Sequence, residues 1–134
     1  MPETRISSEL MTNFKVSEDR KTVSWKDGEK LLKFKFQYPV SAHHIKYLDK
    51  VLIHSSTDET GETNLAIYDP DGTMISRPPM PTLKHKVFGV YSVWFEQNQR
   101  KITVVLLSDE YVPYDTACSF DLETYEFSKF HPTY

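Results

Sequence analysis

Short runs of strand-forming residues, each ended by a turn signal, follow one another along almost the whole chain. In the run 30–36, Leu32, Phe34 and Phe36 alternate with residues that include two lysines. A period of two is typical of a strand that buries one face and exposes the other. The Asp27-Gly28 pair just before this run is a signal for a tight hairpin turn. The pattern predicts an all-β fold built from antiparallel β-meander units.

The runs expected to form strands are residues 14–16, 22–25, 30–36, 45–48, 51–55, 64–68, 73–76, 87–96, 101–107, 117–121 and 125–130. The hairpin 87–107 is the most apolar, and apolar side chains fall on both of its faces. Because such strands are typical of a sheet covered on both sides, we expect this hairpin at the centre of the fold. Residues 1–12 show no sustained period, which predicts a loose or short helical lead-in before a single β domain over residues 13–134.

Composition limits the class of protein. The chain has 134 residues, 39% of them hydrophobic, which suits one globular domain. No apolar run approaches the roughly 20 residues needed to cross a bilayer, and the first residues lack the pattern of a signal peptide. Cys118 is the only cysteine, so an internal disulfide is impossible and a reducing compartment is favoured. We therefore expect a cytoplasmic protein that does not bind membranes.

Charge is divided unevenly along the chain. The formal net charge is -3 at pH 7, which argues against a protein held on nucleic acid by overall electrostatics. Residues 1–50 carry ten Lys or Arg against seven Asp or Glu, whereas residues 51–134 carry six against twelve. The C-terminal part is therefore predicted to present an acidic face. Lys33 and Lys35 fall on the strand face opposite the phenylalanines, so charge and stacking do not combine into an RNA-binding surface.

Three segments of the chain look alike. Each has an aromatic residue at the end of a strand, then a short acidic turn and a further strand; the segments begin at Trp25, Tyr68 and Phe120. They recur at intervals of about 40 to 50 residues, the spacing of propeller blades. The arrangement resembles the outer hairpins of β-propeller blades over most of residues 13–134, without the Trp-Asp or kelch diglycine signatures.

The resemblance implies a partial, propeller-like stack of about three blades. Because propellers typically close with four to eight blades, such a stack would be capped or completed by another copy of the chain. The alternative arrangements of the same strands are a two-layer sandwich and an irregular barrel.

The residues that could carry chemistry are scattered. The five histidines include His43, His44 and His54, and none of the five repeats at a spacing typical of metal ligands. We expect exposed loop histidines, with His54 partly packed in a strand, and a buried Cys118. No catalytic residue, metal or cofactor is predicted, so an enzyme is the less favoured class. An enzyme or small-ligand site dispersed over His43, His54 and Asp58 is kept as an alternative.

The loop 109–115 points most directly to a partner. It combines tyrosines with acidic residues around a proline, and rigid aromatic contacts with a charged rim are typical of protein interfaces. The predicted partner-binding residues are Asp109, Glu110, Tyr111, Tyr114 and Asp115. The sequence therefore favours a non-enzymatic protein-binding domain with a basic protein partner.

A small, acidic, all-β chain of this type is similar to many bacterial immunity proteins. The similarity implies an inhibitor that occludes the active cleft of its partner. The alternative is a self-associating, propeller-like structural module, whose exposed strand edges join copies of the chain into a homo-oligomer.

Overall fold

Antiparallel β-strands make up nearly all of the fold, as predicted. The computed structural model describes residues 10–133. The elements in chain order are β1 (Thr12–Val16), β2 (Thr22–Asp27), β3 (Lys30–Lys35), β4 (Ser41–Ile45), β5 (Lys50–His54), α1 (Thr57–Thr60), β6 (Leu65–Tyr68), β7 (Met74–Ser76), β8 (Val87–Trp94), β9 (Lys101–Ser108), β10 (Thr116–Asp121) and β11 (Phe127–Pro132). Within residues 10–133, no helix is long and apolar enough to span a membrane. The predicted lead-in over residues 1–12 lies almost wholly outside the described residues.

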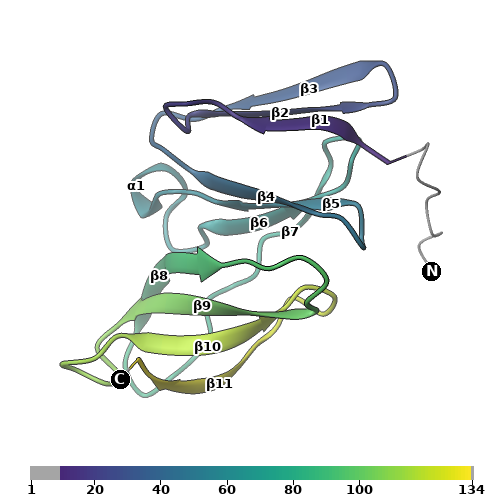
Figure 1. The fold of residues 1–134 in the computed structure, drawn as a ribbon. Coiled ribbons are helices and arrows are strands. Elements are labelled where there is room, and N and C mark those ends of the chain that lie inside the picture. The colour runs from purple at the N-terminus through teal and green to yellow at the C-terminus, as the bar shows by residue number, and fades with distance from the viewer. Residues whose placement is uncertain (1–9, 134) are drawn as a thin grey trace.

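The strands form three sheets, each a meander in which strands adjacent in sequence pair with one another. The first sheet has the order β1-β2-β3, the middle sheet β4-β5-β6-β7 and the third sheet β8-β9-β10-β11. The sheets lie one above the other, with the first sheet at the top of Figure 1 and the third at the bottom. In the described part of the chain none of them closes into a barrel. Each adjacent pair packs face to face like a sandwich, so the molecule has three layers.

Two hydrophobic cores lie between the three layers. The first core, between the first and middle sheets, is built from Met11, Val23, Trp25, Val40, Val51, Ile53, Ala66 and Tyr68. The second core, between the middle and third sheets, is built from Ile45, Leu52, Leu65, Ile67, Val87, Val90, Ile102, Val104, Leu106, Cys118, Phe120 and Leu122. Strand β5 contributes Val51 and Ile53 to one core and Leu52 to the other, as expected when successive side chains alternate between the faces of a sheet.

The three similar segments occupy the same place in the three sheets. They contain the turns β2–β3, β6–β7 and β10–β11, so each forms the last hairpin of its sheet. The aromatic residues that open them are all buried: Trp25, Tyr68 and Phe120. In this chain, therefore, the sequence likeness marks positions that are equivalent in the structure.

The prediction of a strand at residues 45–48 was wrong. Strand β4 ends at Ile45, and a turn follows in which Leu48 N donates to Ile45 O and Asp49 N donates to Lys46 O. Asp49 has a φ of 50°, a left-handed conformation that breaks a strand and suits Asp or Asn. The segment between β5 and β6, for which no strand was predicted, begins with the single helical turn α1, which Ser56 caps by accepting from Asp58 N at 3.1 Å.

The predicted central position of the hairpin 87–107 was also wrong. This hairpin belongs to the third sheet, an outer layer, and β8 is an edge strand of that sheet. Phe88, Tyr91 and Trp94 on β8 are 48%, 62% and 66% exposed. Apolar content alone does not distinguish a covered central strand from an edge strand with exposed aromatic side chains, and the middle sheet holds the centre instead.

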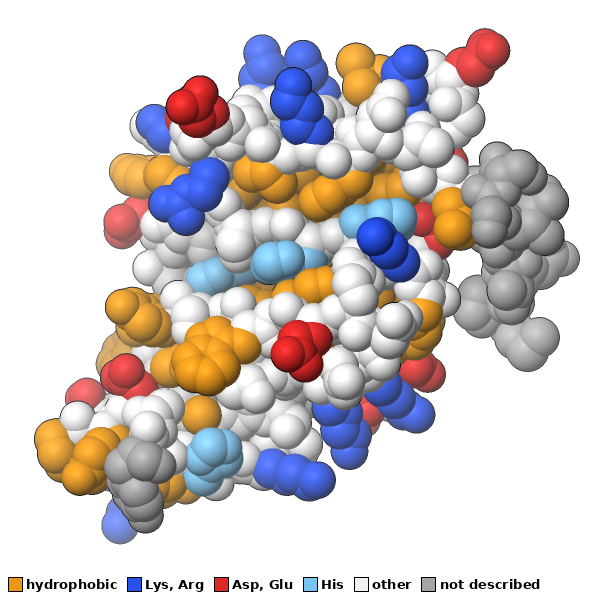
Figure 2. Space-filling view, in the orientation of Figure 1, with side chains coloured by type: hydrophobic (Ala, Val, Ile, Leu, Met, Phe, Trp, Pro, Cys, Tyr) orange, Lys and Arg blue, Asp and Glu red, His pale blue; other side chains and the backbone are white. Residues whose placement is uncertain are grey.

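The two outer faces of the stack differ in charge. Four exposed lysines on the first sheet face away from the first core: Lys15, Lys26, Lys33 and Lys35. None of them forms an ion pair with another described residue, and basic side chains crowd over this sheet at the top of Figure 2. The two central rows that face outward on the third sheet are uncharged: Ser92, Val105 and Ala117, then Trp94, Thr103 and Ser119. The predicted separation of lysines from Phe34 is confirmed, since Phe34 packs against the first core.

Candidate functional site

The predicted partner-binding loop 109–115 joins β9 to β10 at one end of the third sheet. Two of its residues bond to neighbouring segments: Glu110 Oε1 accepts from His85 N at 2.6 Å, and Tyr111 Oη donates to Phe130 O at 3.4 Å. These bonds hold the loop against the sheet. The other three predicted residues are exposed: Asp109, Tyr114 and Asp115.

Strand β8 presents an aromatic edge beside this loop, formed by Phe88, Tyr91 and Trp94. Val87 pairs with Ser108 at the end of β9, so β8 begins where the loop 109–115 starts. The β8–β9 register shifts twice, between Val87 and Val90 and again just beyond Val90. Such bulges turn side chains away from the regular alternation. The result is a strand that carries three large aromatic side chains into solvent.

Side chains from the middle sheet occupy the backbone edge of β8 at Val90. Asn64 Oδ1 accepts from Val90 N at 2.8 Å, and Asn64 Nδ2 donates to Val90 O at 2.8 Å. The amide therefore pairs with Val90 as a neighbouring strand would. His54 Nε2 donates to the same carbonyl at 2.7 Å. We call Asn64, His54 and Val90 the interlayer clamp, because they join the middle sheet to the third.

Gly89 permits this close approach of the two sheets. Its φ is +145°, and a Cβ there would lie 2.7 Å from Thr57 Cγ2 and 3.2 Å from Asn64 Oδ1. Both distances are shorter than ordinary van der Waals contact. Any larger residue would push β8 away from the clamp, so glycine is required at this position.

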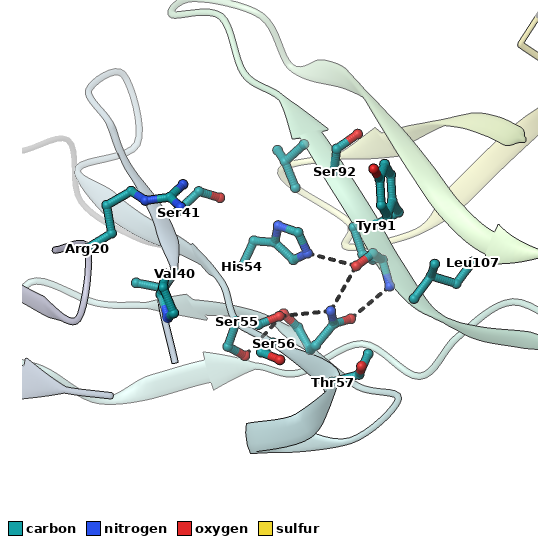
Figure 3. A pocket seen from close by; sticks show the side chains of 14 residues that line it. Arg20, Val40, Ser41, His54, Ser55, Ser56, Thr57, Tyr91, Ser92 and Leu107 are labelled. Atoms are coloured by element: carbon teal, nitrogen blue, oxygen red, sulfur yellow. Dashed lines mark hydrogen bonds between the residues drawn. The ribbon is translucent and has the colours of Figure 1, made fainter. Parts of the chain in front are cut away.

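A pocket of about 420 Å³ opens beside the interlayer clamp, between the middle and third sheets (Figure 3). This volume lies within the range of small-molecule sites, about 300–1,000 Å³. Its polar lining comes from separate elements: Arg20 from the β1–β2 turn, Ser41 from β4, His54 from β5, and Tyr91 and Ser92 from β8. No Asp or Glu occurs among the described residues that line it.

The histidines near this site lie in strands, and the expectation of exposed loop histidines was wrong for two of them. His43 is partly buried and His44 mostly buried on β4, the strand that was predicted too far along the chain. They point to opposite faces. The His43 ring stacks on Phe95 with centroids 4.8 Å apart, whereas His44 Nε2 lies 2.8 Å from Asp49 Oδ1. Histidine side chains consequently gather across the middle of the face seen in Figure 2.

Burial keeps two of these imidazoles neutral. It lowers the pKa of His54 below the ordinary 6.5, although the hydrogen bond to Val90 O acts in the opposite direction. Burial also lowers the pKa of His43, and the proximity of His54 adds to the effect. Because His54 Nε2 donates to a carbonyl, the lone pair of the neutral ring is on Nδ1.

The alternative site of His43, His54 and Asp58 is not brought together around the pocket. His54 lines it, but His43 and Asp58 are absent from its described lining. No group of three or more His, Cys, Asp or Glu within the described residues could hold a metal ion. Cys118 is buried in β10, as predicted, and burial raises the pKa of its thiol to about 12. Little of the thiolate is therefore present at neutral pH, so the thiol has low reactivity.

Sequence reasoning missed Arg20, Asn64 and Gly89 as parts of this site. Gly89 offered a signal, because an isolated glycine inside a strand pattern indicates a bulge or a close backbone approach. Arg20 and Asn64 stand next to turns and look like ordinary surface residues there. Their roles depend on contacts with residues far away in sequence.

The chain matches no protein-family model, no curated protein and no solved structure. Its function must therefore be argued from the site itself.

Proposed function

We propose that this chain is a non-enzymatic protein-binding domain, with the aromatic edge of β8 at the centre of its contact surface. The observation that carries the proposal is the exposure of Phe88, Tyr91 and Trp94, which are 48%, 62% and 66% accessible on one strand. Aromatic side chains dominate the energetics of protein interfaces when a partner buries them. Exposed apolar patches on small proteins commonly mark such contacts.

The partner contacts these side chains and does not extend the sheet. An unpaired edge strand normally invites another strand to pair with it. At Val90, however, both backbone groups already bond to Asn64, and the carbonyl also bonds to His54. A partner strand would have to displace the interlayer clamp, so side-chain packing is the favoured mode of binding.

The acidic loop 109–115 supplies the rim of the same surface. Asp109, Tyr114 and Asp115 are exposed beside the start of β8, and a charged rim favours a partner of opposite sign. The partner in this proposal is therefore a basic protein. The most specific version of the proposal is an immunity-type inhibitor that covers a basic cleft of its partner. The free, buried Cys118 is consistent with a cytoplasmic protein.

Replacement of two edge aromatics tests the proposal. A tagged chain is used to capture partners from its host's lysate, and the affinity of the captured protein is measured for the wild type and for a Tyr91→Ser/Trp94→Ser variant. We expect the double variant to lose at least about thirtyfold in affinity. Leu31→Ser is the matched control, because Leu31 is 56% exposed on the opposite outer face and its replacement should leave affinity unchanged. Equal binding by the double variant would overturn the proposal.

The contribution of the loop has its own test. An Asp109→Ala/Asp115→Ala variant should weaken binding severalfold and reduce its dependence on salt, because exposed charges act through screened electrostatics. Unchanged affinity at low salt would remove the loop from the surface.

A second candidate is self-association as a propeller-like module, which rests on the difference between the outer faces. The outer face of the first sheet carries four lysines, whereas the central rows on the outer face of the third sheet are uncharged and include Trp94. A second copy of the chain could pack the outer face of its third sheet against the same face of the first copy, which would form an isologous dimer. Native mass at high concentration tests this candidate: a dimer that Trp94→Lys dissociates supports it, and a monomer excludes it.

A further inference from the structure

The backbone of Arg20 is held at the mouth of the pocket beside the interlayer clamp. Its φ of 59° is left-handed, and Arg20 N donates to Ser17 O at 2.9 Å. Arg20 O accepts from Val40 N at 2.8 Å, which ties the β1–β2 turn to the segment that leads into β4. The turn therefore delivers this side chain to the pocket while leaving it exposed to solvent.

The Arg20 guanidinium has no carboxylate partner among the described residues. The adjacent Asp19 carboxylate is engaged inside the turn, where it accepts from Ser17 Oγ at 2.6 Å and from Lys21 N at 3.0 Å. These hydrogen bonds lower the pKa of Asp19 and keep it ionised within its own turn. Because the described lining of the pocket also lacks Asp and Glu, no carboxylate within it competes with a ligand for the Arg20 guanidinium.

Hydrogen-bond donors surround the interior of the pocket. The His54 ring lies between Arg20 and Ser41 on one side and the β8 residues Tyr91 and Ser92 on the other (Figure 3). Within residues 10–133 the hydroxyl groups of Ser41, Tyr91 and Ser92 form no hydrogen bond to another side chain or backbone group. The Ser41 hydroxyl, on the strand face that also carries His54, is therefore available to a ligand in the pocket, as is the Nδ1 edge of His54.

We propose that this pocket binds a small organic anion through a phosphate or carboxylate group. The Arg20 guanidinium pairs with the anion, and its planar fork suits two oxygens at once. The Ser41 hydroxyl donates to a remaining oxygen, and His54 donates from Nδ1 once that nitrogen is protonated. This inference goes beyond the proposed function and does not rest on it, since the aromatic edge contacts a protein whereas the pocket takes a small molecule.

Anion binding should be coupled to proton uptake at His54. The free ring is neutral because burial lowers its pKa, and a nearby anion favours the imidazolium form. The titratable or charged groups that face His54 are Arg20 from the β1–β2 turn, His43 from β4 and Tyr91 from β8. The other polar residues of the described lining add no charge: Ser55, Ser56, Thr57 and Asn64. Binding therefore strengthens as pH falls.

The test is an NMR titration of the labelled chain with four probes: inorganic phosphate, phosphoserine, succinate and, at matched ionic strength, sodium chloride. We expect saturable shifts at the His54 ring and at the amides of Ser41 and Ser92 with the anions and not with chloride. A response to both phosphates alone identifies a phosphate site, and a response to succinate alone identifies a carboxylate site. No saturable shift with any anion at tens of millimolar would overturn the proposal.

Single substitutions distinguish anion binding in this pocket from non-specific ionic binding elsewhere on the surface. Arg20→Gln should weaken the anion about tenfold or more, whereas Lys21→Gln, a charge change in the same turn, should leave affinity within about twofold because Lys21 does not line the described pocket. His54→Gln should remove the gain in affinity between pH 8 and pH 6, with circular dichroism confirming the fold. Equal affinity in wild type and Arg20→Gln, or shifts centred on Lys33 and Lys35, would show that the pocket is not the site.

Discussion

The two cores of this molecule join their sheets in different ways. In the first core, Trp25 stacks on Phe34 with centroids 5.2 Å apart, Phe34 contacts Tyr68 at 5.1 Å, and Trp25 Nε1 donates to Pro70 O at 2.7 Å. The second core is mostly aliphatic, and a polar contact between Asn64 and the backbone of Val90 supplements it at the β8 edge.

The difference explains where the molecule can bind a ligand. Large stacked rings fill the space between the first and middle sheets, and the indole hydrogen bond of Trp25 lies within that packing. The interlayer clamp instead holds two strand edges together through polar groups, and polar side chains from several elements meet beside it. The 420 Å³ pocket lies at this second junction. A junction between sheets that is held by polar side chains at a strand edge is therefore better suited to binding a ligand than a junction filled by aromatic rings.

The largest effect should come from removing the aromatic centre of the first core. Trp25→Ala deletes the largest fully buried side chain and should lower the free energy of unfolding by about 4 kcal/mol. Urea unfolding followed by circular dichroism measures the change. Trp94→Ala is the control, because Trp94 is 66% exposed and its loss should cost less than about 0.5 kcal/mol. Similar losses in the two variants would contradict the assignment of the first core.

A smaller loss should follow from breaking the interlayer clamp. Asn64→Ala leaves Val90 N without its acceptor in a buried position, which should cost about 2 kcal/mol. The same unfolding experiment measures it, with exposed Gln99→Ala as the control. If Asn64→Ala were as stable as the control, the second junction would depend on aliphatic packing alone, and the contrast between the cores would fail.

Acid should weaken the second junction more than the first. The pKa values of His43 and His54 are lowered in the folded chain, so below the ordinary pKa of 6.5 the unfolded chain binds more protons. The free energy of unfolding therefore falls as pH drops through 6.5 toward the folded pKa values, and this contribution is fully present above 6.5. A stability series from pH 8 to pH 5 measures the slope. A His43→Asn/His54→Gln variant should flatten it, whereas exposed His131→Gln should leave it unchanged.

The smallest effect is a gain in stability within the second core. Thr116 Oγ1 is the one buried side-chain polar atom in the described part of the chain that has no hydrogen-bond partner. Thr116→Val keeps the shape and removes the unsatisfied hydroxyl, which should raise the free energy of unfolding by about 0.5 to 1 kcal/mol. Thermal unfolding measures the gain, and a loss of stability would show that the hydroxyl does find a partner in solution.

The parts of the fold that depend on short-range sequence patterns were predictable. The alternation around Phe34 correctly assigned one face of β3 to the core, and the likeness of the segments at Trp25, Tyr68 and Phe120 identified equivalent hairpins. The position of β4 was missed because the turn before β5 begins directly after Ile45 and takes up the residues that had been assigned to a strand. The exposure of β8 was missed because an apolar edge strand and an apolar central strand have the same local pattern.

The candidate site was less predictable than the fold. The loop 109–115 stood out from its composition, and its place beside the aromatic edge became apparent only through the pairing of Val87 with Ser108. The pocket was not foreseen at all. Its residues include Arg20, His54 and Ser92, and the distances between them along the chain exceed what any local motif describes.

Local patterns in the sequence account for most of the strands, the meander pairing of neighbours and the three equivalent final hairpins, because these depend on alternation and turn chemistry within a few residues. The three-dimensional structure was needed to show which sheet lies in the middle, which aromatic side chains stay in solvent, and that Arg20, His54 and Ser92 line one pocket whose described lining has no Asp or Glu. Those outcomes depend on how whole sheets stack, and stacking brings together residues whose separation in sequence leaves no trace in local pattern.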